Sequence, residues 1–382
     1  MLQRGRLASL VLVPACAVVW LAAPVQPVCA QPVKLPTEKY FGNMEVVKTF
    51  NGPMPTGVTV SHKGRIFVNY PRWGDNVTAT VAELVNGNEV PFQSDGLVSV
   101  QSIVVDANDM LWILDTGSIA FGPTKFGGPK LVGIDLSTNK VAKKILFPAN
   151  VVLPRSYLND VRFDLRRGKG GMAYITDSSS GGGIIVVDLA SGKSWRRLAN
   201  HFSTKAEPGF LPVVEGQPLM VRPANKPPQH VAVGSDGIAI SADGKRLFYC
   251  PLSSRQLYSV SVDALSNAKL TDAQVAKTVI KLGDKGGGAD GLESDGAGNL
   301  YITNYEHNAI VRRNAKGQYE TLIHDLRLMW PDTMCLASDG YLYFTVNQLH
   351  RQPQFHNSVE ARERPYALMR TKIGIRPVTL KK

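Results

Sequence analysis

The sequence contains little cysteine, with four residues in a chain of 382. Cys16 and Cys29 fall within the first 30 residues, which leaves Cys250 and Cys335 for the rest of the chain. So sparse a set excludes a small disulfide-stapled scaffold, and no CxxC pair is present to bind zinc. Each remaining cysteine lies in or beside an expected strand. Two outcomes stay open: a Cys250–Cys335 disulfide or two buried free thiols.

Charged residues are also few, at 19% of the chain, and they are not concentrated in one run. The formal net charge is +12, from 43 basic and 31 acidic residues. The densest basic spots are only residues 166–169 and 362–364. A nucleic-acid-binding protein would gather its basic residues on one face or along one element. We therefore expect no nucleic-acid partner and interpret the excess as a basic, solvated surface.

Familiar catalytic and cofactor motifs are missing. The chain has no HExxH, no P-loop and no GxSxG, and its seven histidines show no metal-ligand spacing. Residues 286–291 match GxGxxG formally, but a strand is expected where a dinucleotide site needs a helix. The chemistry therefore has to come from a constellation of polar residues rather than from a short motif.

Beyond residue 23 no apolar stretch is long enough to span a membrane. Residues 1–30 have the pattern of a secretory signal peptide, with a basic start at Arg4 and Arg6 and an uncharged apolar stretch over residues 7–23. A transmembrane anchor is the alternative, which the prolines in and beside that stretch disfavour. We expect cleavage before Gln31 and a secreted or periplasmic protein without a membrane span.

What the chain does have is an internal repeat of two short strands joined by a tight polar turn. Residues 292–304 (LESDGAGNLYITN) show it most plainly, and apolar residues alternate with the period of a strand in residues 234–250. Six copies end at Asn69, Asp115, Asp177, Cys250, Asn304 and Asn347. One hairpin cannot bury its apolar face alone, so repeats at this spacing predict stacked blades. We predict an all-β fold in which residues 31–382 form a single six-bladed β-propeller.

Strands at the two ends of the mature chain are expected to close the ring. Residues 44–50 precede the first copy, residues 366–373 follow the last, and both have the composition of a strand. Pairing them within one blade removes the open edge of the sheet. The largest insertion, residues 201–233, is rich in proline. A loop of that length is expected to be a lid, a partner site or a plain surface excursion.

A hairpin returns to its starting point, so residues at the two ends of each copy meet at one mouth of the ring. Side chains before the first strands form an inner ring of Thr56, Gln101, Asn159, Asp160, Asp236, Asp290 and Asp332. The strand ends form an outer ring that includes Asp115, Asp177, Asn304 and Asn347. Most of these residues are carboxylates or amides. We therefore predict a polar, acidic mouth that binds a small molecule.

Two ligand chemistries fit such a mouth. Converging carboxylate and amide oxygens suit Ca²⁺ or another divalent cation, with Asp236, Asp290 and Asn159 as its ligands. They also suit a polar or cationic small molecule. For any single residue the alternative is structural, since Asp and Asn side chains bond backbone donors and fix loops. For Asp160, Asp236, Asp290 and Asp332 together a joint role is favoured, because crowded carboxylates need a counterion or shared protons.

Several stretches carry a family resemblance. They are residues 111–117 (LWILDTG), residues 158–198 (LNDVRFDLRRGKGGMAYITDSSSGGGIIVVDLASGKSWRRL) and residues 234–250 (GSDGIAISADGKRLFYC). The sequence resembles the Yellow/major royal jelly protein family in its bacterial form. The resemblance implies a secreted six-bladed propeller. Insect relatives are linked to dopachrome conversion, to biogenic-amine binding and to nutrient storage, and no single activity is shared by the family.

More distantly, the repeats resemble the gluconolactonase and regucalcin propellers. That resemblance implies a central divalent metal held by Glu, Asn and Asp side chains at the mouth, and hydrolysis of sugar lactones. Asp236 and Asp290 match the later blades of that pattern. The first copy departs from it, because residues 54–57 (MPTG) stand where a Glu ligand is expected.

Three hypotheses follow for the function. The first is a propeller that binds a small polar or cationic molecule at the acidic mouth, with or without tautomerase-like chemistry in which a carboxylate is the general base. The second is a metal-dependent lactonase. The third is a non-enzymatic scaffold that binds a protein partner. The sequence does not decide whether the chain is an enzyme.

Overall fold

The computed structural model describes residues 38–93, 96–125 and 127–382. By their contacts, residues 39–382 form one unit, distinct from residues 1–38. The expected signal peptide, residues 1–30, lies outside the described residues. The short helices are α1 (Val262–Ser266), α2 (Asp272–Ala276), η1 (Leu349–Arg351) and η2 (Pro353–Phe355). Across the described ranges, no helix is long and apolar enough to cross a membrane.

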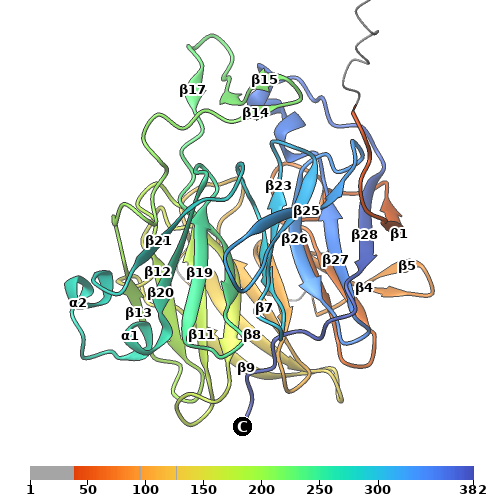
Figure 1. The fold of residues 1–382 in the computed structure, drawn as a ribbon. Helices are drawn as coiled ribbons and strands as arrows, with labels where there is room; N and C mark the ends of the chain where they lie inside the picture. Colours follow the sequence, from red (N-terminus) through yellow and green to blue (C-terminus); the bar gives the residue numbers. More distant parts are fainter. Residues whose placement is uncertain (1–37, 94–95, 126) are drawn as a thin grey trace, which may run out of the picture. The chain divides into compact units, whose positions relative to one another are not determined.

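Over the described residues, the unit is built mainly from six antiparallel sheets of four strands, which are the blades of a propeller (Figure 1). Blade 1 is β2 (Gly57–Val60), β3 (Ile66–Asn69), β4 (Val81–Val85) and β5 (Asn88–Pro91). Blade 2 is β6 (Val100–Val105), β7 (Met110–Thr116), β8 (Pro129–Asp135) and β9 (Lys140–Leu146). Blade 3 is β10 (Leu158–Asp164), β11 (Met172–Asp177), β12 (Ile184–Asp188) and β13 (Ser194–Arg197). Blade 4 is β18 (Ser235–Ile240), β19 (Arg246–Pro251), β20 (Gln256–Ser261) and β21 (Ile280–Asp284). Blade 5 is β22 (Leu292–Ser294), β23 (Leu300–Asn304), β24 (Ala309–Arg313) and β25 (Tyr319–His324). Blade 6 is β26 (Pro331–Leu336), β27 (Tyr341–Val346), β28 (Tyr366–Lys372) and β1 (Glu45–Phe50).

The first strand of each blade lies at the centre of the ring. β2, β6, β10, β18, β22 and β26 each contact the first strand of the next blade, and β26 contacts β2, so the circle is complete. Every residue of β10 and of β18 is buried, as expected for strands packed on both faces. The prediction of an all-β, six-bladed propeller is confirmed.

The two ends of the described unit close the ring within blade 6. Its strand order is β1-β28-β27-β26, so the first strand of the unit is the outermost strand of the last blade. Phe50 pairs with Tyr366 and Glu45 with Arg370. The Phe50 side chain is fully buried, which anchors β1 by its apolar face. The predicted closure by N-terminal and C-terminal strands is confirmed.

Cys250 and Cys335 are free thiols. Cys250 is buried beside Leu257 and Ala289, between blades 4 and 5. Cys335 lies on β26, with its Sγ 3.9 Å from Thr59 Oγ1 of blade 1. The cysteines therefore face different neighbouring blades. Burial raises the pKa of Cys250 to about 11 and that of Cys335 to about 12, so both thiols stay protonated at neutral pH.

Residues 201–233, which we call the lid, connect blade 3 to blade 4. The lid contains two small hairpins: β14 (Val213–Val214) pairs with β15 (Gln217–Pro218), and β16 (Met220–Val221) pairs with β17 (Gln229–His230). In Figure 1 the lid strands β14, β15 and β17 lie above the ends of the blade strands. Lid residues Val214 and Leu219 pack in one apolar cluster with Trp330 and Phe355. The lid is therefore docked on one end of the propeller.

Candidate functional site

Five of the seven predicted inner-ring residues lie at irregularities in the first strands. In blades 2, 3, 4 and 6 the register between the first and second strands shifts near the start of the first strand. The positions skipped by the pairing include Gln101, Asn159, Asp160, Asp236 and Asp332. A bulge bends a strand and re-aims its side chains, and bulges are common next to binding sites. The irregularities thus release these polar residues from the regular ladder.

Two Asp-Gly pairs bring the acids of neighbouring blades together. A Cβ at Gly237 would lie 2.4 Å from the carbonyl oxygen of Asp290, and a Cβ at Gly291 would lie 2.3 Å from the carbonyl oxygen of Asp332. Only glycine fits such a close approach of one backbone to another. Because each glycine directly follows an aspartate, the carboxyls of Asp236, Asp290 and Asp332 succeed one another around the axis.

Asp236, Asp290 and Asp332 form what we call the acidic floor. Their exposed fractions are 5%, 7% and 3%. Burial, with added repulsion from neighbouring acids, raises the pKa of Asp290 to about 6 and the pKa values of Asp236 and Asp332 well above their usual range. The neighbouring Asp290 carboxyl is one cause of the raised pKa of Asp236, so the two carboxyls disfavour simultaneous ionisation. At neutral pH the floor therefore carries less than its full formal charge.

Neutral donors hold each carboxyl of the floor in place. Trp330 Nε1 donates to Asp290 Oδ2 at 2.6 Å. Asn347 Nδ2 donates to Asp332 Oδ2 at 2.6 Å, and the Ser178 hydroxyl donates to Asp236 Oδ2 at 3.0 Å. These bonds orient the carboxyls without neutralising them, because none of the three donors carries a charge.

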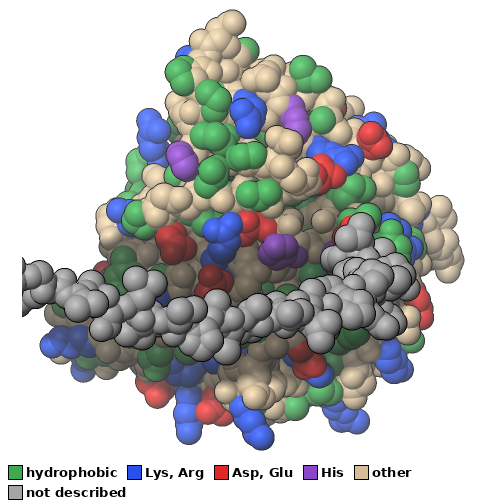
Figure 2. Space-filling model, turned by 45° about the horizontal axis from the view of Figure 1, so that its top comes forward, with side chains coloured by type: hydrophobic (Ala, Val, Ile, Leu, Met, Phe, Trp, Pro, Cys, Tyr) green, Lys and Arg blue, Asp and Glu red, His purple; other side chains and the backbone are tan. Residues whose placement is uncertain are grey.

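The acidic floor lies in a pocket of about 210 Å³, which we call the mouth. Gln101 and Asn159 line the same pocket, as the sequence predicted for the inner ring. Lid residues Leu219 and Val231 line it as well, together with Phe355 from η2. Figure 2 shows the top face of Figure 1 turned forward, with acidic side chains around the hollow in its middle. The mouth thus combines a polar floor with an apolar cover.

Asp160 was also expected at the mouth, but it does not line this pocket. Both of its carboxylate oxygens lie 3.0 Å from Arg162 Nη1, and Oδ1 also accepts a hydrogen bond from the Ser102 hydroxyl at 2.7 Å. Asp160 therefore has a counterion of its own. Asp160 and Arg162 are two residues apart on β10, and residues with this spacing on a strand lie on the same face, so the spacing was the available signal for this pair.

Two outer-ring carboxylates fix loops by pairing with buried cations. Lys130 Nζ donates to Asp115 Oδ2 at 2.7 Å, and both side chains are almost fully buried. Arg196 donates to Asp177 Oδ2, while Asp177 Oδ1 accepts from the backbone N–H of Tyr157 at 2.9 Å. Neither residue lines the mouth. Asp115 and Asp177 therefore have the structural role that was the alternative for single Asp residues, which is to fix loops through local bonds.

The two outer-ring amides also make local contacts. Asn304 Nδ2 donates to the carbonyl oxygen of Gly286 at 3.0 Å. Asn347 donates to Asp332 and so supports the floor without lining the mouth. The outer ring thus braces the loops and the inner ring, rather than facing the pocket.

Aromatic walls are the part of the mouth that the sequence analysis missed. Trp73, Phe121 and Tyr157 form a cluster. The ring centroid of Phe121 lies 5.0 Å from that of Trp73 and 5.0 Å from that of Tyr157. Trp330 and Tyr305 stack at 4.1 Å. Trp73 and Phe121 occupy loops after the second strands of blades 1 and 2, and Tyr157 directly precedes β10. Aromatic residues repeated just outside the hairpins were the available signal.

The mouth supplies only part of a metal shell. Within the described ranges, no group of three or more His, Cys, Asp or Glu side chains is placed to hold a metal ion. Asn159 does line the pocket with Asp236 and Asp290. In blade 1 Thr56 accepts a hydrogen bond from Asn69 at 3.0 Å, where the lactonase pattern expects a Glu ligand. Because Ca²⁺ takes six to eight oxygen ligands, these side chains alone do not complete its coordination.

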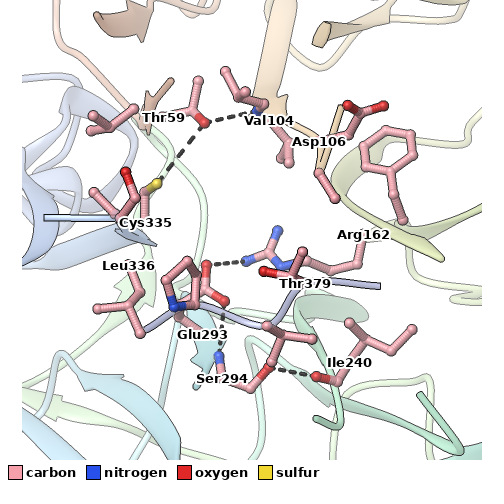
Figure 3. A pocket seen from close by; sticks show the side chains of 18 of the residues that line it. Thr59, Val104, Asp106, Arg162, Ile240, Glu293, Ser294, Cys335, Leu336 and Thr379 are labelled. Atoms are coloured by element: carbon pink, nitrogen blue, oxygen red, sulfur yellow. Dashed lines mark hydrogen bonds and ion pairs between the residues drawn. The ribbon is translucent and has the colours of Figure 1, made fainter. Parts of the chain in front are cut away.

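A second, smaller pocket of about 110 Å³ lies at the other end of the first strands. Figure 3 shows the Arg162 guanidinium in this pocket, facing Glu293, with Thr379 of the C-terminal segment beside it. Arg162 Nη2 donates to the carbonyl oxygen of Leu292 at 2.7 Å and lies 3.7 Å from Glu293 Oε2. The carbonyl oxygen of Leu380 accepts from Leu165 N at 2.8 Å, so the C-terminal segment crosses this end of the ring.

The comparison with protein families decides the relationship of the chain. The profile of the major royal jelly protein family matches residues 98–376, which is more than half of the chain. The chain belongs to the major royal jelly protein family. The resemblance to the Yellow/major royal jelly protein family, which the sequence analysis drew from residues 111–117, 158–198 and 234–250, is confirmed.

Relatives of this family member include Protein yellow of Drosophila guanche, which is 28% identical over 247 residues, covering 57% of this chain and 41% of that protein. Major royal jelly protein 7 of Apis mellifera is 30% identical over 172 residues, covering 44% of this chain and 35% of that protein. The chain spans about two-fifths of the length of the curated relatives it matches.

Solved structures share the fold of this royal jelly family member at low identity. Regucalcin of Agrobacterium tumefaciens, described as a calcium-binding protein, has a TM-score of 0.53 and 14% identity, covering 88% of this chain and 96% of that chain. A gluconolactonase of Xanthomonas campestris has a TM-score of 0.53 and 11% identity, covering 86% and 88%. Likenesses at such identity show the fold alone.

The raised pKa of Asp290 predicts that this acid lowers stability at high pH. Its pKa is about 6 when folded and about 3.9 in an unfolded chain, so the stability from its protonated form is full below pH 4 and is lost as pH rises through 6. Asp290→Asn does not titrate and still accepts from Trp330. We expect the variant to be more stable than the parent by on the order of 3 kcal/mol at pH 8, and by only about 1 kcal/mol at pH 4.5.

Urea denaturation at the two pH values measures this effect. Asp243→Asn is the matched control, since Asp243 lies exposed in the turn between β18 and β19. An Asp290→Asn variant that is less stable than the parent at pH 8 would contradict this prediction, because it would show that the ionised carboxylate stabilises the fold.

Proposed function

We propose that this protein is a secreted propeller that binds a small organic cation carrying an aromatic ring in its acidic mouth. The observation that carries the proposal is the floor of Asp236, Asp290 and Asp332. Three buried carboxyls disfavour one another's ionisation, and a bound cation removes that penalty. Among the described residues that line the pocket, Arg155 is the only Lys or Arg, and it is exposed. The pocket therefore offers its acids no buried counterion and favours a cationic ligand.

The walls of the mouth favour an aromatic ring on that ligand. Phe121 is 51% exposed and stands between Trp73 and Tyr157 in the wall cluster. A ligand ring can extend this stack in an offset or edge-on arrangement. An ammonium group near the faces of these rings gains a further cation–π attraction. An arylalkylamine presents both groups, the ring to the wall and the ammonium to the floor.

The same acids suit a tautomerase-like reaction on the bound molecule. Asp290, with a pKa of about 6, is mostly ionised at neutral pH and can accept a proton from one atom of a substrate. Asp236 has a higher pKa, keeps its proton and can donate it to another atom. One proton leaves the substrate and one returns, so the reaction is balanced without a co-reactant. Catechol-derived quinone compounds are the substrate class for this step.

A divalent-metal-dependent lactonase is the second candidate. It is supported by the fold shared with the gluconolactonase of Xanthomonas campestris and by Asp236, Asp290 and Asn159 in one pocket. The incomplete ligand set and Thr56 in blade 1 weigh against it. We therefore place amine binding first and make metal binding a separate test.

The acidic floor predicts that the positive charge of the ligand strengthens binding. 2-Phenylethylamine is expected to bind more tightly than 2-phenylethanol, which has the same ring and no charge. Its affinity is expected to fall about tenfold per pH unit below pH 6, because protonation of Asp290 competes with the cation. Asp290→Asn is expected to weaken amine binding about tenfold or more, and Asp243→Asn to leave it unchanged. Titration calorimetry between pH 5 and 8 measures all of these affinities.

Equal affinities for the amine and the alcohol would contradict the acidic floor as the recognition element. So would amine binding that is the same at pH 5 and pH 8, or that survives Asp290→Asn unchanged.

The incomplete ligand set at the mouth predicts that Ca²⁺ does not stabilise the fold. Residues 31–382 are expected to melt at the same temperature in excess Ca²⁺ and in EDTA, because a ligand stabilises the fold only when it binds the folded state. Differential scanning calorimetry makes the comparison, and Asp236→Asn is the variant for any shift seen. A rise of several degrees in Ca²⁺ that Asp236→Asn abolishes would instead establish a metal site at the mouth and favour the lactonase.

A further inference from the structure

The tip of the first lid hairpin carries an unusual residue. Glu215 and Gly216 form the two-residue turn between β14 and β15, and both have positive φ angles, of 51° and 73°. Such turns favour Asn, Asp or Gly, because other side chains are strained at positive φ. A glutamate at the first turn position therefore destabilises the hairpin locally. A residue in a strained conformation is held there by its contacts, so the contacts of the Glu215 carboxylate are the next question.

The Glu215 carboxylate reaches from the lid to the segment that follows blade 6. Its Oε2 accepts hydrogen bonds from His350 Nε2 at 2.9 Å and from Arg351 Nε at 3.0 Å. Its Oε1 accepts a second bond from Arg351. Nearby, Arg222 N of the lid donates to the carbonyl oxygen of Gln354 at 2.8 Å. Glu215 thus clasps the lid to this segment by charge-assisted hydrogen bonds.

His350 connects this clasp to the acidic floor. The His350 side chain is 4% exposed, and its ring stacks on Trp330 with centroids 5.8 Å apart and an interplanar angle of 17°. Trp330 also stacks on Tyr305 and donates to Asp290. Trp330 also has a φ of 62°, which is strained for a bulky residue. Its position therefore depends on the neighbours that hold it.

We propose that Glu215 is a positioning residue that latches the lid over the mouth and, through His350 and Trp330, holds the Asp290 carboxyl in place. Leu219 and Val231 of the lid line the pocket that holds the floor, so the position of the lid shapes that pocket. Lid closure and the arrangement of the floor are then one coupled event. The inference rests on the proposed function only for the identity of the ligand. The contacts of Glu215 that hold the lid do not depend on which ligand binds.

Glu215→Gly separates the latch from the stability of the hairpin. Glycine is better suited than glutamate to the positive φ of this turn, so the variant removes the carboxylate while favouring the turn. Asn225→Gly is the matched control. Asn225 lies in the same lid, between β16 and β17, also has a positive φ of 60°, and is exposed. Both variants place a glycine at a positive-φ position of the lid, and only the first removes the clasp.

Three measurements follow the latch. Hydrogen–deuterium exchange of residues 210–222 and 349–356 is expected to rise at least tenfold in the Glu215→Gly variant, because about tenfold corresponds to one charge-assisted hydrogen bond and the clasp has three. The near-ultraviolet circular dichroism of the stacked Trp330 and Tyr305 rings is expected to weaken. Association and dissociation of 2-phenylethylamine, followed by stopped flow, are both expected to speed up. Asn225→Gly is expected to change none of these, and Glu215→Gln to lie between the parent and Glu215→Gly.

The outcomes separate the latch from the amine site. Unchanged exchange in Glu215→Gly would overturn the latch. Faster exchange with an unchanged aromatic dichroism signal would overturn the positioning of Trp330. If the parent protein binds no amine, the proposed function fails, and the exchange and dichroism measurements still decide whether Glu215 holds the lid.

Discussion

The pairing of β1 with β28 is the constraint on which the site depends. It supplies the fourth, outermost strand of blade 6 and ties the segment that leads into blade 1 to the last blade. Once the ring is closed, six first strands meet around one axis. Asp236, Asp290 and Asp332, from three different blades, are then crowded into one buried floor. The closure thus imposes a proximity that isolated carboxyls would avoid.

That proximity links stability to binding. Burial and mutual repulsion raise the pKa values of the floor, so the fold holds protons there that an unfolded chain would release. Neutral donors such as Trp330 and Asn347 fix the carboxyls without neutralising them. The arrangement is unfavourable without a counterion, and in the proposed function a bound cation supplies that counterion. Asp115 and Asp177 show the contrast, because each is satisfied by a buried Lys or Arg.

The sequence was enough to predict the ring and the inner residues, and not the contacts between blades. Alternation and polar turns are local properties, so the six hairpins, the closure and the positions of Gln101, Asn159, Asp236, Asp290 and Asp332 follow from them. The aromatic wall around Phe121 and the clasp of Glu215 on His350 depend on which side chains meet across blades and loops. Local pattern does not encode those meetings.

The central claim is that a cation binds by displacing a proton from the acidic floor. Titration calorimetry with 2-phenylethylamine at pH 5, in two buffers of different ionisation enthalpy, counts the protons exchanged on binding. Because Asp290, with a pKa of about 6, is mostly protonated at pH 5, we predict the release of about one proton per bound amine. Binding without proton release would contradict the account, since the ligand would then be held by groups other than these carboxyls.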